Sequence, residues 1–232
     1  MGSHFLKEVN PIRWLLKALK DSCLFRRNRF SLHVKVKAVL LYMAGLSYRD
    51  ITYVLRFVPC SHKAVRLWVK KLEQVNVNVE AKHRRTVAVD ETKIKADEEW
   101  CYVWAAIDVD TRELLAVWVS WQRSILHAEA FLKRTLQTCT NKPLIVVDKG
   151  PWYPEAFQAL GVEWVHKTFG ERNRIERWFR TVKARTRRFF NNFPVRKTPI
   201  FKIKLFIRLF VLWYNFIRPH QTLKSPSATP IT

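Results

Sequence analysis

The sequence predicts a protein of two parts, a small all-α region followed by a larger α/β region. In the first third of the chain, apolar residues recur at helical spacing between the Ser and Gly residues that are typical of helix ends. After a polar stretch at 75–85, expected to be an extended linker, the pattern changes to short runs rich in Val, Ile, Thr and aromatic side chains, typical of strands. We therefore expect a helical region at 1–80, an α/β region at 81–195, and a C-terminal helix and tail at 196–232 that pack on the α/β region.

Within the N-terminal region, Ser31, Ser47 and Ser61 each stand where the N-cap of a short helix is expected. The helix that follows Ser61 has an apolar inner face and a basic outer face. This arrangement is typical of a helix-turn-helix, whose last helix enters the major groove of DNA. A generic three-helix bundle would share the apolar spacing, and each basic residue could equally be a solvated surface residue. The DNA-binding residues expected on this helix are His62, Lys63, Arg66 and Lys70.

The elements of the α/β region are expected in the order β-β-β-α-β-α-β-α. Strands are expected at Thr86–Lys95, Trp100–Val109, Glu113–Trp121, Leu144–Val147 and Val162–Val165. Helices are expected at Ile125–Gln137, Glu155–Leu160 and about Arg172–Phe190. A three-stranded meander followed by parallel strands joined through helices is the order of a ribonuclease-H-like mixed sheet. In such a sheet the first and fourth strands lie side by side.

Three acidic residues occupy distinctive places in this predicted fold. Asp90 ends the apolar run of the first strand, Asp148 directly follows the fourth strand, and Glu176 lies near the start of the long helix. Carboxylate oxygens are the ligands that Mg²⁺ and Mn²⁺ prefer. The sequence therefore predicts that these three residues are catalytic and bind Mg²⁺ or Mn²⁺, with two ions expected, for phosphoryl transfer on nucleic acid.

The long helix separates an apolar stripe from a basic face. Glu176 shares the basic face with Arg180, Lys183 and Arg187, which we expect to bind the DNA backbone. An ordinary salt bridge between Glu176 and Arg180 is the alternative explanation for this acid. Glu171, which precedes the helix, is the rival for the third catalytic position.

The composition points to a polyanionic partner. Lys and Arg number 42 against 19 Asp and Glu, which gives a formal net charge of +23 and a pI near 10.3. The four cysteines form no CxxC pair, so we expect neither a zinc site nor a disulfide framework. We expect the cysteines to be reduced and the protein to be cytoplasmic. We expect no secretory signal and no membrane association, because the most apolar run is shorter than the roughly 20 residues that a membrane span needs.

The segments VDET, VVDKGPWY and ERNRIERWF resemble the three acidic motifs of the DDE transposases of insertion sequences, in particular the insertion-sequence-six group. The segment YNFIRPHQTL resembles a tail that these enzymes share with retroviral-type integrases. The resemblance covers nearly the whole chain, although the interval between the last two acids is shorter than the family's. It implies a ribonuclease-H-like integrase core with Asp90, Asp148 and Glu176 as its triad. It also implies Mg²⁺-dependent cleavage and strand transfer, binding of terminal inverted repeats and target DNA, and a homo-oligomer, a dimer or higher, on DNA.

Two alternatives to a transposase remain at this point. One is a related ribonuclease-H-fold nuclease or integrase that cuts DNA without joining it to a target. The other is a transposase-derived repressor that only binds DNA. The three acids argue against the repressor, because binding alone requires none of them.

Overall fold

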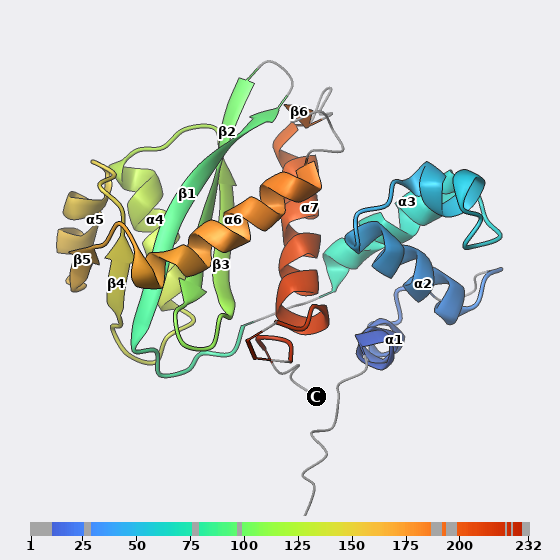
Figure 1. Ribbon diagram of the computed structural model, residues 1–232, viewed down its shortest axis with the longest axis horizontal. Helices are drawn as coiled ribbons and strands as arrows, with labels where there is room; N and C mark the ends of the chain where they lie inside the picture. Colours follow the sequence, from blue (N-terminus) through green and yellow to red (C-terminus); the bar gives the residue numbers. More distant parts are fainter. Residues whose placement is uncertain are drawn as a thin grey trace, which may run out of the picture. The chain divides into compact units, whose positions relative to one another are not determined.

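The structure is a computed structural model that describes residues 11–25, 29–75, 79–96, 99–186, 192–193, 199–220, 222–223 and 225–228. The chain divides into two compact units (Figure 1). One comprises Met1–Val77, Leu212–Pro230 and Thr232, and the other comprises Asn78–Val211 and Ile231. The boundaries that we expected after residues 80 and 195 stay predictions. None of the described helices is both long and apolar enough to cross a membrane.

The N-terminal part of the first unit is all-α, as predicted. Its helices are α1 (Pro11–Asp21), α2 (Leu32–Met43), the π-helix η1 (Asp50–Val54), α3 (His62–Lys71) and the 3-10 helix η2 (Leu72–Gln74). The Ser31 and Ser61 side chains accept hydrogen bonds from the first turns of α2 and α3. Ser47 and Asp50 cap each other reciprocally, with N–O distances of 2.9 and 3.1 Å. The N-caps inferred from the sequence are therefore confirmed.

The C-terminal helix runs through α7 (Pro199–Leu212) into the π-helix η5 (Trp213–Ile217) and ends before Pro219. Within the first unit, the fully buried Asn215 fixes the segment that follows. Its carbonyl oxygen accepts from the Ala228 N–H at 3.0 Å, and its Oδ1 accepts from the Ser227 hydroxyl at 3.3 Å. Ser227 and Ala228 are thus held by hydrogen bonds to the side chain and the main chain, respectively, of one buried residue.

The second unit is built on the predicted mixed sheet. Its strands are β1 (Thr86–Ala96), β2 (Glu99–Asp108), β3 (Leu114–Ser120), β4 (Leu144–Val147), β5 (Trp164–His166) and β6 (Asn192–Phe193). The strand order is β3-β2-β1-β4-β5, and β6 pairs with β1. β1, β2 and β3 form the antiparallel meander, whereas β4 and β5 run parallel to β1. The adjacency of the first and fourth strands is therefore confirmed.

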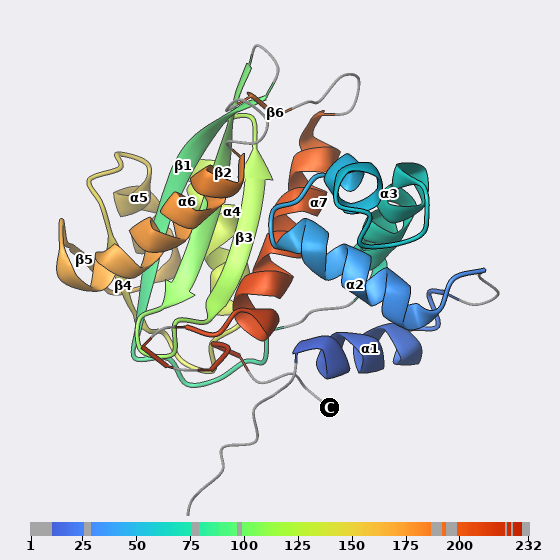
Figure 2. The ribbon, with the colours of Figure 1, turned by 45° about the vertical axis from the view of Figure 1, so that its right-hand side comes forward.

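Helices cover both faces of this sheet (Figures 1 and 2). They are α4 (Ile125–Leu136), α5 (Tyr153–Leu160), the 3-10 helix η3 (Gly170–Arg172) and α6 (Asn173–Thr186). α4 and α5 lie behind the sheet, where Phe131 and Phe157 join a core cluster with Trp104 of β2. α6 crosses the other face and buries Ile175 and Trp178. The predicted apolar stripe of the long helix is thus the side on which it packs.

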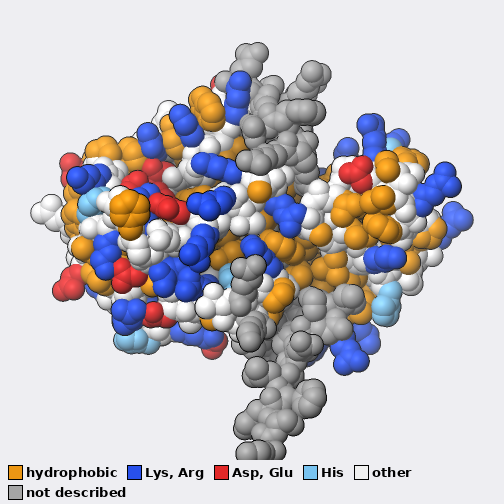
Figure 3. Space-filling view, viewed as in Figure 1, with side chains coloured by type: hydrophobic (Ala, Val, Ile, Leu, Met, Phe, Trp, Pro, Cys, Tyr) orange, Lys and Arg blue, Asp and Glu red, His pale blue; other side chains and the backbone are white. Residues whose placement is uncertain are grey.

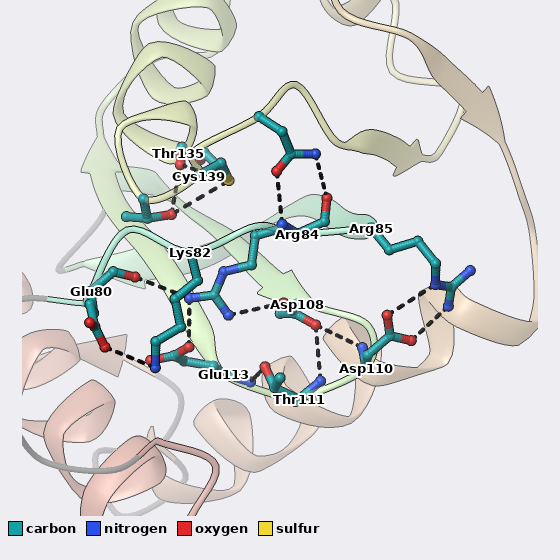
Figure 4. Close-up of polar contacts among 12 residues, drawn as sticks. Glu80, Lys82, Arg84, Arg85, Asp108, Asp110, Thr111, Glu113, Thr135 and Cys139 are labelled. Atoms are coloured by element: carbon teal, nitrogen blue, oxygen red, sulfur yellow. Dashed lines mark hydrogen bonds and ion pairs between the residues drawn. The ribbon is translucent and has the colours of Figure 1, made fainter.

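A buried ion cluster fixes the start of β1 (Figure 4). Arg84 is 1% exposed, and its terminal nitrogens contact Asp108 at 3.0 Å and Glu113 at 2.7 Å. The second nitrogen also donates to the Glu80 carbonyl oxygen at 3.2 Å. The end of the 75–85 stretch is therefore a packed part of the second unit, which corrects the expectation of a linker throughout. Its local polarity could not show that its partners lie 24 and 29 residues further on.

Candidate active site

The parallel register of β1 and β4 brings two of the predicted site residues to the same level of the sheet. Ala88 of β1 is paired with Val146 of β4. Asp90 lies two residues after Ala88, and Asp148 lies two residues after Val146. Since side chains alternate between faces, Asp90 lies on the same face as Ala88, opposite the core residues Val87 and Val89. This is the face that α6 covers.

The third predicted residue comes from α6. Glu176 lies in the first turn of this helix, next to Ile175, which is fully buried. The Glu176 side chain is 40% exposed, so it stands at the edge of the helix that packs on the sheet. The two strands and the helix therefore each supply one acid to the same face.

Arg172 joins the three acids. Its Nη2 lies 3.1 Å from Asp90 Oδ2 and 3.5 Å from Asp148 Oδ2, and its Nη1 lies 3.4 Å from Glu176 Oε1. The acids predicted from the sequence are thus brought together around one guanidinium. Sequence reasoning missed Arg172, although its place four residues before Glu176 is a signal for an ion pair on a helix.

The electrostatics of the site follow from burial and from the crowding of like charges. Burial raises the pKa of Asp90 to about 7; Arg172 opposes this shift, and the nearby Asp148 and Glu91 carboxylates add to it. The pKa of Arg172 is raised, because the three acids outweigh the opposing effect of its own burial. A carboxylate in such a place is stabilised by any cation that approaches it.

A second polar network supports the site from the opposite face of the sheet. Glu91 follows Asp90 and points away from it, as alternation predicts; its carboxylate accepts from the Tyr153 hydroxyl at 2.6 Å and from Arg123 at 3.2 Å. The Arg123 guanidinium stacks over the Trp152 ring, 4.2 Å from its centroid. This network ties β1 to the start of α5, and so to the loop that begins at Asp148. The only sign of this network in the sequence is a carboxylate on the buried face of a strand.

Glu171 does not join the three acids. Its carboxylate instead forms an ion pair with Lys167, four residues earlier. Glu176, in turn, is paired with Arg172 rather than with Arg180, the partner considered for an ordinary helix salt bridge. Of the two rivals, Glu176 is the one that shares a partner with Asp90 and Asp148.

Most of the basic residues predicted to bind DNA fall on exposed faces of their elements. Arg180 and Lys183 are exposed on α6, and Arg187 lies outside the described residues. Figure 3 shows Lys and Arg side chains around a smaller group of acids on this side of the second unit. In the first unit, the predicted residues Lys63, Arg66 and Lys70 are exposed on α3, as is the neighbouring Lys71. His62 is half-buried at the start of α3, with its Nδ1 3.2 Å from the Tyr53 hydroxyl.

The three acids fit a divalent cation by their chemistry. All are carboxylates, the hard oxygen donors that Mg²⁺ and Mn²⁺ prefer, and they surround a positive group. Across the described part of the chain, no group of three or more His, Cys, Asp or Glu side chains is close enough to hold a metal ion. The guanidinium of Arg172 lies between the carboxylates.

The family model of the DDE domain of IS240-type transposases matches residues 84–207. An uncharacterised protein of Methanocaldococcus jannaschii is 41% identical over 196 residues, which cover 84% of this chain and 91% of that protein. The transposase for insertion sequence element IS257 in transposon Tn4003 of Staphylococcus aureus is 32% identical over 134 residues, which cover 55% of this chain and 59% of the transposase.

Among solved structures, the chain is similar to the HTLV-2 integrase catalytic core domain in complex with magnesium. The similarity has a TM-score of 0.45 at 12% identity, and it covers 65% of this chain and 97% of that domain. A chain of the simian T-cell lymphotropic virus intasome is also similar, with a TM-score of 0.49 at 11% identity over 82% of this chain and 72% of that chain.

Proposed function

The chain belongs to the family of DDE transposases of insertion sequences, of the insertion-sequence-six type, and from this premise we propose that it is a metal-dependent DNA transposase. It cleaves DNA strands at the ends of its insertion sequence and transfers them into target DNA. Its substrates are the terminal inverted repeats and a target duplex, and it acts on them as a dimer or a higher homo-oligomer.

The observation that carries this proposal is the convergence of Asp90, Asp148 and Glu176 on one cation, within the segment that matches the family model. Two strands and a helix, far apart in the sequence, supply one carboxylate each to this point. A protein that only binds DNA has no use for three acids gathered on a surface that must meet phosphates, because they repel the ligand.

In this proposal the three carboxylates hold two Mg²⁺ or Mn²⁺ ions. Such ions, when bound, activate the attacking oxygen and stabilise the leaving oxygen of an in-line phosphoryl transfer. Asp90 lies on β1 and Asp148 directly follows β4, so strand pairing sets the level of both ligands. Glu176 supplies the third from a helix held to the sheet by buried apolar side chains.

The exposed cations of α6 orient the DNA. Arg180 and Lys183 lie one and two turns beyond Glu176 on the same side of the helix, where they can contact successive phosphates next to the acids. A water molecule as nucleophile gives a cleaved strand, whereas a 3′-hydroxyl gives a joined product. Both reactions require the same in-line placement of the phosphate.

The experiment that tests this function incubates the full-length protein with labelled DNA carrying the ends of its insertion sequence and a supercoiled target plasmid. We expect labelled strands joined to the plasmid with Mg²⁺ and none with EDTA. Asp148→Asn, which keeps the shape of the side chain but removes its charge, is expected to bind the end DNA as the wild type does and to yield no product.

The remaining outcomes separate the alternatives. Cleaved ends without joining to the plasmid would identify a related nuclease of the same fold. Sequence-specific binding without any product in Mg²⁺ or Mn²⁺ would identify a transposase-derived repressor and would overturn the enzymatic function.

A further inference from the structure

Arg172 makes contacts that the proposed reaction does not use. Its two terminal nitrogens reach Asp90, Asp148 and Glu176 at distances between 3.1 and 3.5 Å. The side chain is 15% exposed, and its Nε is buried without a hydrogen-bond partner. A structural arginine usually has its donors satisfied, because an unpaired buried donor is unfavourable. This one is held through its tip by acids alone.

The positive charge of Arg172 partly neutralises a local excess of negative charge. Three carboxylates that approach one point repel each other, and the repulsion is strongest where burial reduces screening. A single guanidinium offsets only part of that charge, so the acids retain an attraction for a cation of higher charge. The site is therefore suited to exchange one positive group for another.

A metal ion and the Arg172 guanidinium cannot occupy this place together. Mg²⁺ binds carboxylate oxygens at about 2.1 Å. An ion shared by Asp90 and Asp148 would stand where Arg172 Nη2 now contacts an Oδ2 atom of each. Among the described residues, no group of three or more His, Cys, Asp or Glu side chains is close enough to hold a metal ion.

The start of the segment that bears Arg172 is loosely packed. Arg172 ends the short 3-10 helix η3, which begins at Gly170. Gly170 has a φ of +80°, and no atom lies within 4 Å of the place that a Cβ would take there. The preceding Phe169 is 77% exposed. The guanidinium can therefore leave the acids without disturbing the core beneath α6.

We propose that Arg172 is the intramolecular counter-ion of the metal-free active site, and that a divalent cation must displace it in order to bind Asp90 and Asp148. This inference rests on the proposed metal-dependent function of the same site. Arg172 is a positioning residue in this scheme: it keeps the three carboxylates together before the ion arrives, and it lowers the affinity for that ion by competing for the same oxygen atoms.

The test measures Mn²⁺ binding to the full-length, metal-free protein by titration calorimetry at fixed ionic strength, without DNA. Arg172→Gln is expected to bind Mn²⁺ about tenfold more tightly than the wild type, which corresponds to about 1.4 kcal/mol at 25 °C. In EDTA the same variant should melt at a lower temperature than the wild type, and saturating Mn²⁺ should raise its melting temperature by more. A merely structural role would lower stability without tightening metal binding.

Two further variants complete the experiment. Arg174→Gln is the matched control, because Arg174 lies two residues further on, at the start of α6, and donates to the carbonyl oxygens of Val109 and Gly170 instead of to the acids; it should bind Mn²⁺ like the wild type. Arg172→Lys keeps the charge without the planar fork and should give an affinity between those of the wild type and Arg172→Gln.

Equal or weaker Mn²⁺ binding by a folded Arg172→Gln would overturn the counter-ion role while leaving the proposed function intact. If that variant fails to fold, an Arg172→Lys affinity no tighter than that of the wild type would overturn the role instead. Absence of Mn²⁺ binding in all these proteins, in the presence of end DNA as well as without it, would contradict the proposed function itself.

Discussion

At the scale of single residues, two neighbouring arginines show how burial determines the contribution of an ion pair to stability. Arg84 is buried between two buried acids, Asp108 and Glu113. Arg85 forms a closer pair with Asp110, at 2.6 Å, but both side chains are about half exposed or more, at 65% and 49%. Water and salt screen the second pair but not the first.

We expect Arg84→Met to lower the free energy of unfolding by about 3–5 kcal/mol, because it leaves two buried carboxylates without their cation. Arg85→Met should change it by less than about 1 kcal/mol. Urea unfolding of the full-length protein measures both. Similar effects of the two substitutions would show that the buried cluster does not hold the start of β1.

Lys35 gives the first unit a pH dependence. This α2 residue is 2% exposed, and its Nζ lies 5.0 Å from the centroid of the Phe25 ring, which Lys71 also approaches. Burial lowers the pKa of Lys35 below its ordinary value of 10.5, and repulsion from Lys71 adds to the effect. The unfolded chain therefore binds more protons at this residue than the folded one, so stability rises with pH through the window that ends near 10.5.

The measurement compares urea unfolding of the wild type and Lys35→Met between pH 7 and pH 10. The wild type should gain stability relative to the variant as the pH rises, since the unfavourable burial of the ammonium disappears when it loses its proton. A difference that stays constant with pH would contradict the lowered pKa.

At the scale of elements, the loop between β4 and α5 depends on one glycine. The N–H of Gly150 donates to Asp148 Oδ1 at 3.1 Å. A Cβ at this position would lie 2.9 Å from atoms of both the Trp152 and Tyr153 rings. Tyr153 is in turn fixed by its hydrogen bond to Glu91. The loop therefore cannot accept a side chain without moving Asp148 or the start of α5.

We expect Gly150→Ala to destabilise the protein by about 1–3 kcal/mol. It should also reduce strand joining by about 100-fold, because a shift of roughly 1 Å at a catalytic group has effects of that size. Pro151→Ala is the control, since Pro151 is exposed and its truncation leaves the ring contacts intact. Wild-type joining by Gly150→Ala would show that Asp148 is not held by this contact.

At the scale of the whole molecule, the sequence predicted best what depends on local pattern and strand order. The order of strands and helices predicted that β1 and β4 are neighbours, and alternation predicted that Asp90 and Glu91 face opposite sides; both are confirmed. What could not be predicted depends on contacts between distant segments. Three such contacts form only in the folded sheet: the ion pairs of Arg84, the hydrogen bond between Tyr153 and Glu91, and the ion pairs of Arg172 with acids from two strands.

Helix ends show the same difference between what a local sequence pattern predicts and what it does not. Ser47 caps a helix as predicted, because its partner Asp50 is only three residues away in the sequence. The π-helix η1 that follows this cap is short and ends at Val54. Arg56 has a φ of +49°, a left-handed conformation that ends helices and that the local sequence does not prescribe for an arginine.

We propose that Asp90, Asp148 and Glu176 together form the catalytic site. The sequence alone distinguished least well between Glu176 and Glu171 as the third of these residues. The structure gives the two glutamates different partners, Arg172 for the first and Lys167 for the second. Strand joining by Glu176→Gln and Glu171→Gln, measured side by side with equal end-DNA binding, therefore tests the claim most directly. We predict that Glu176→Gln lowers joining at least about 100-fold and that Glu171→Gln stays within a few-fold of the wild type. Retained joining by Glu176→Gln, with loss in Glu171→Gln, would contradict the account.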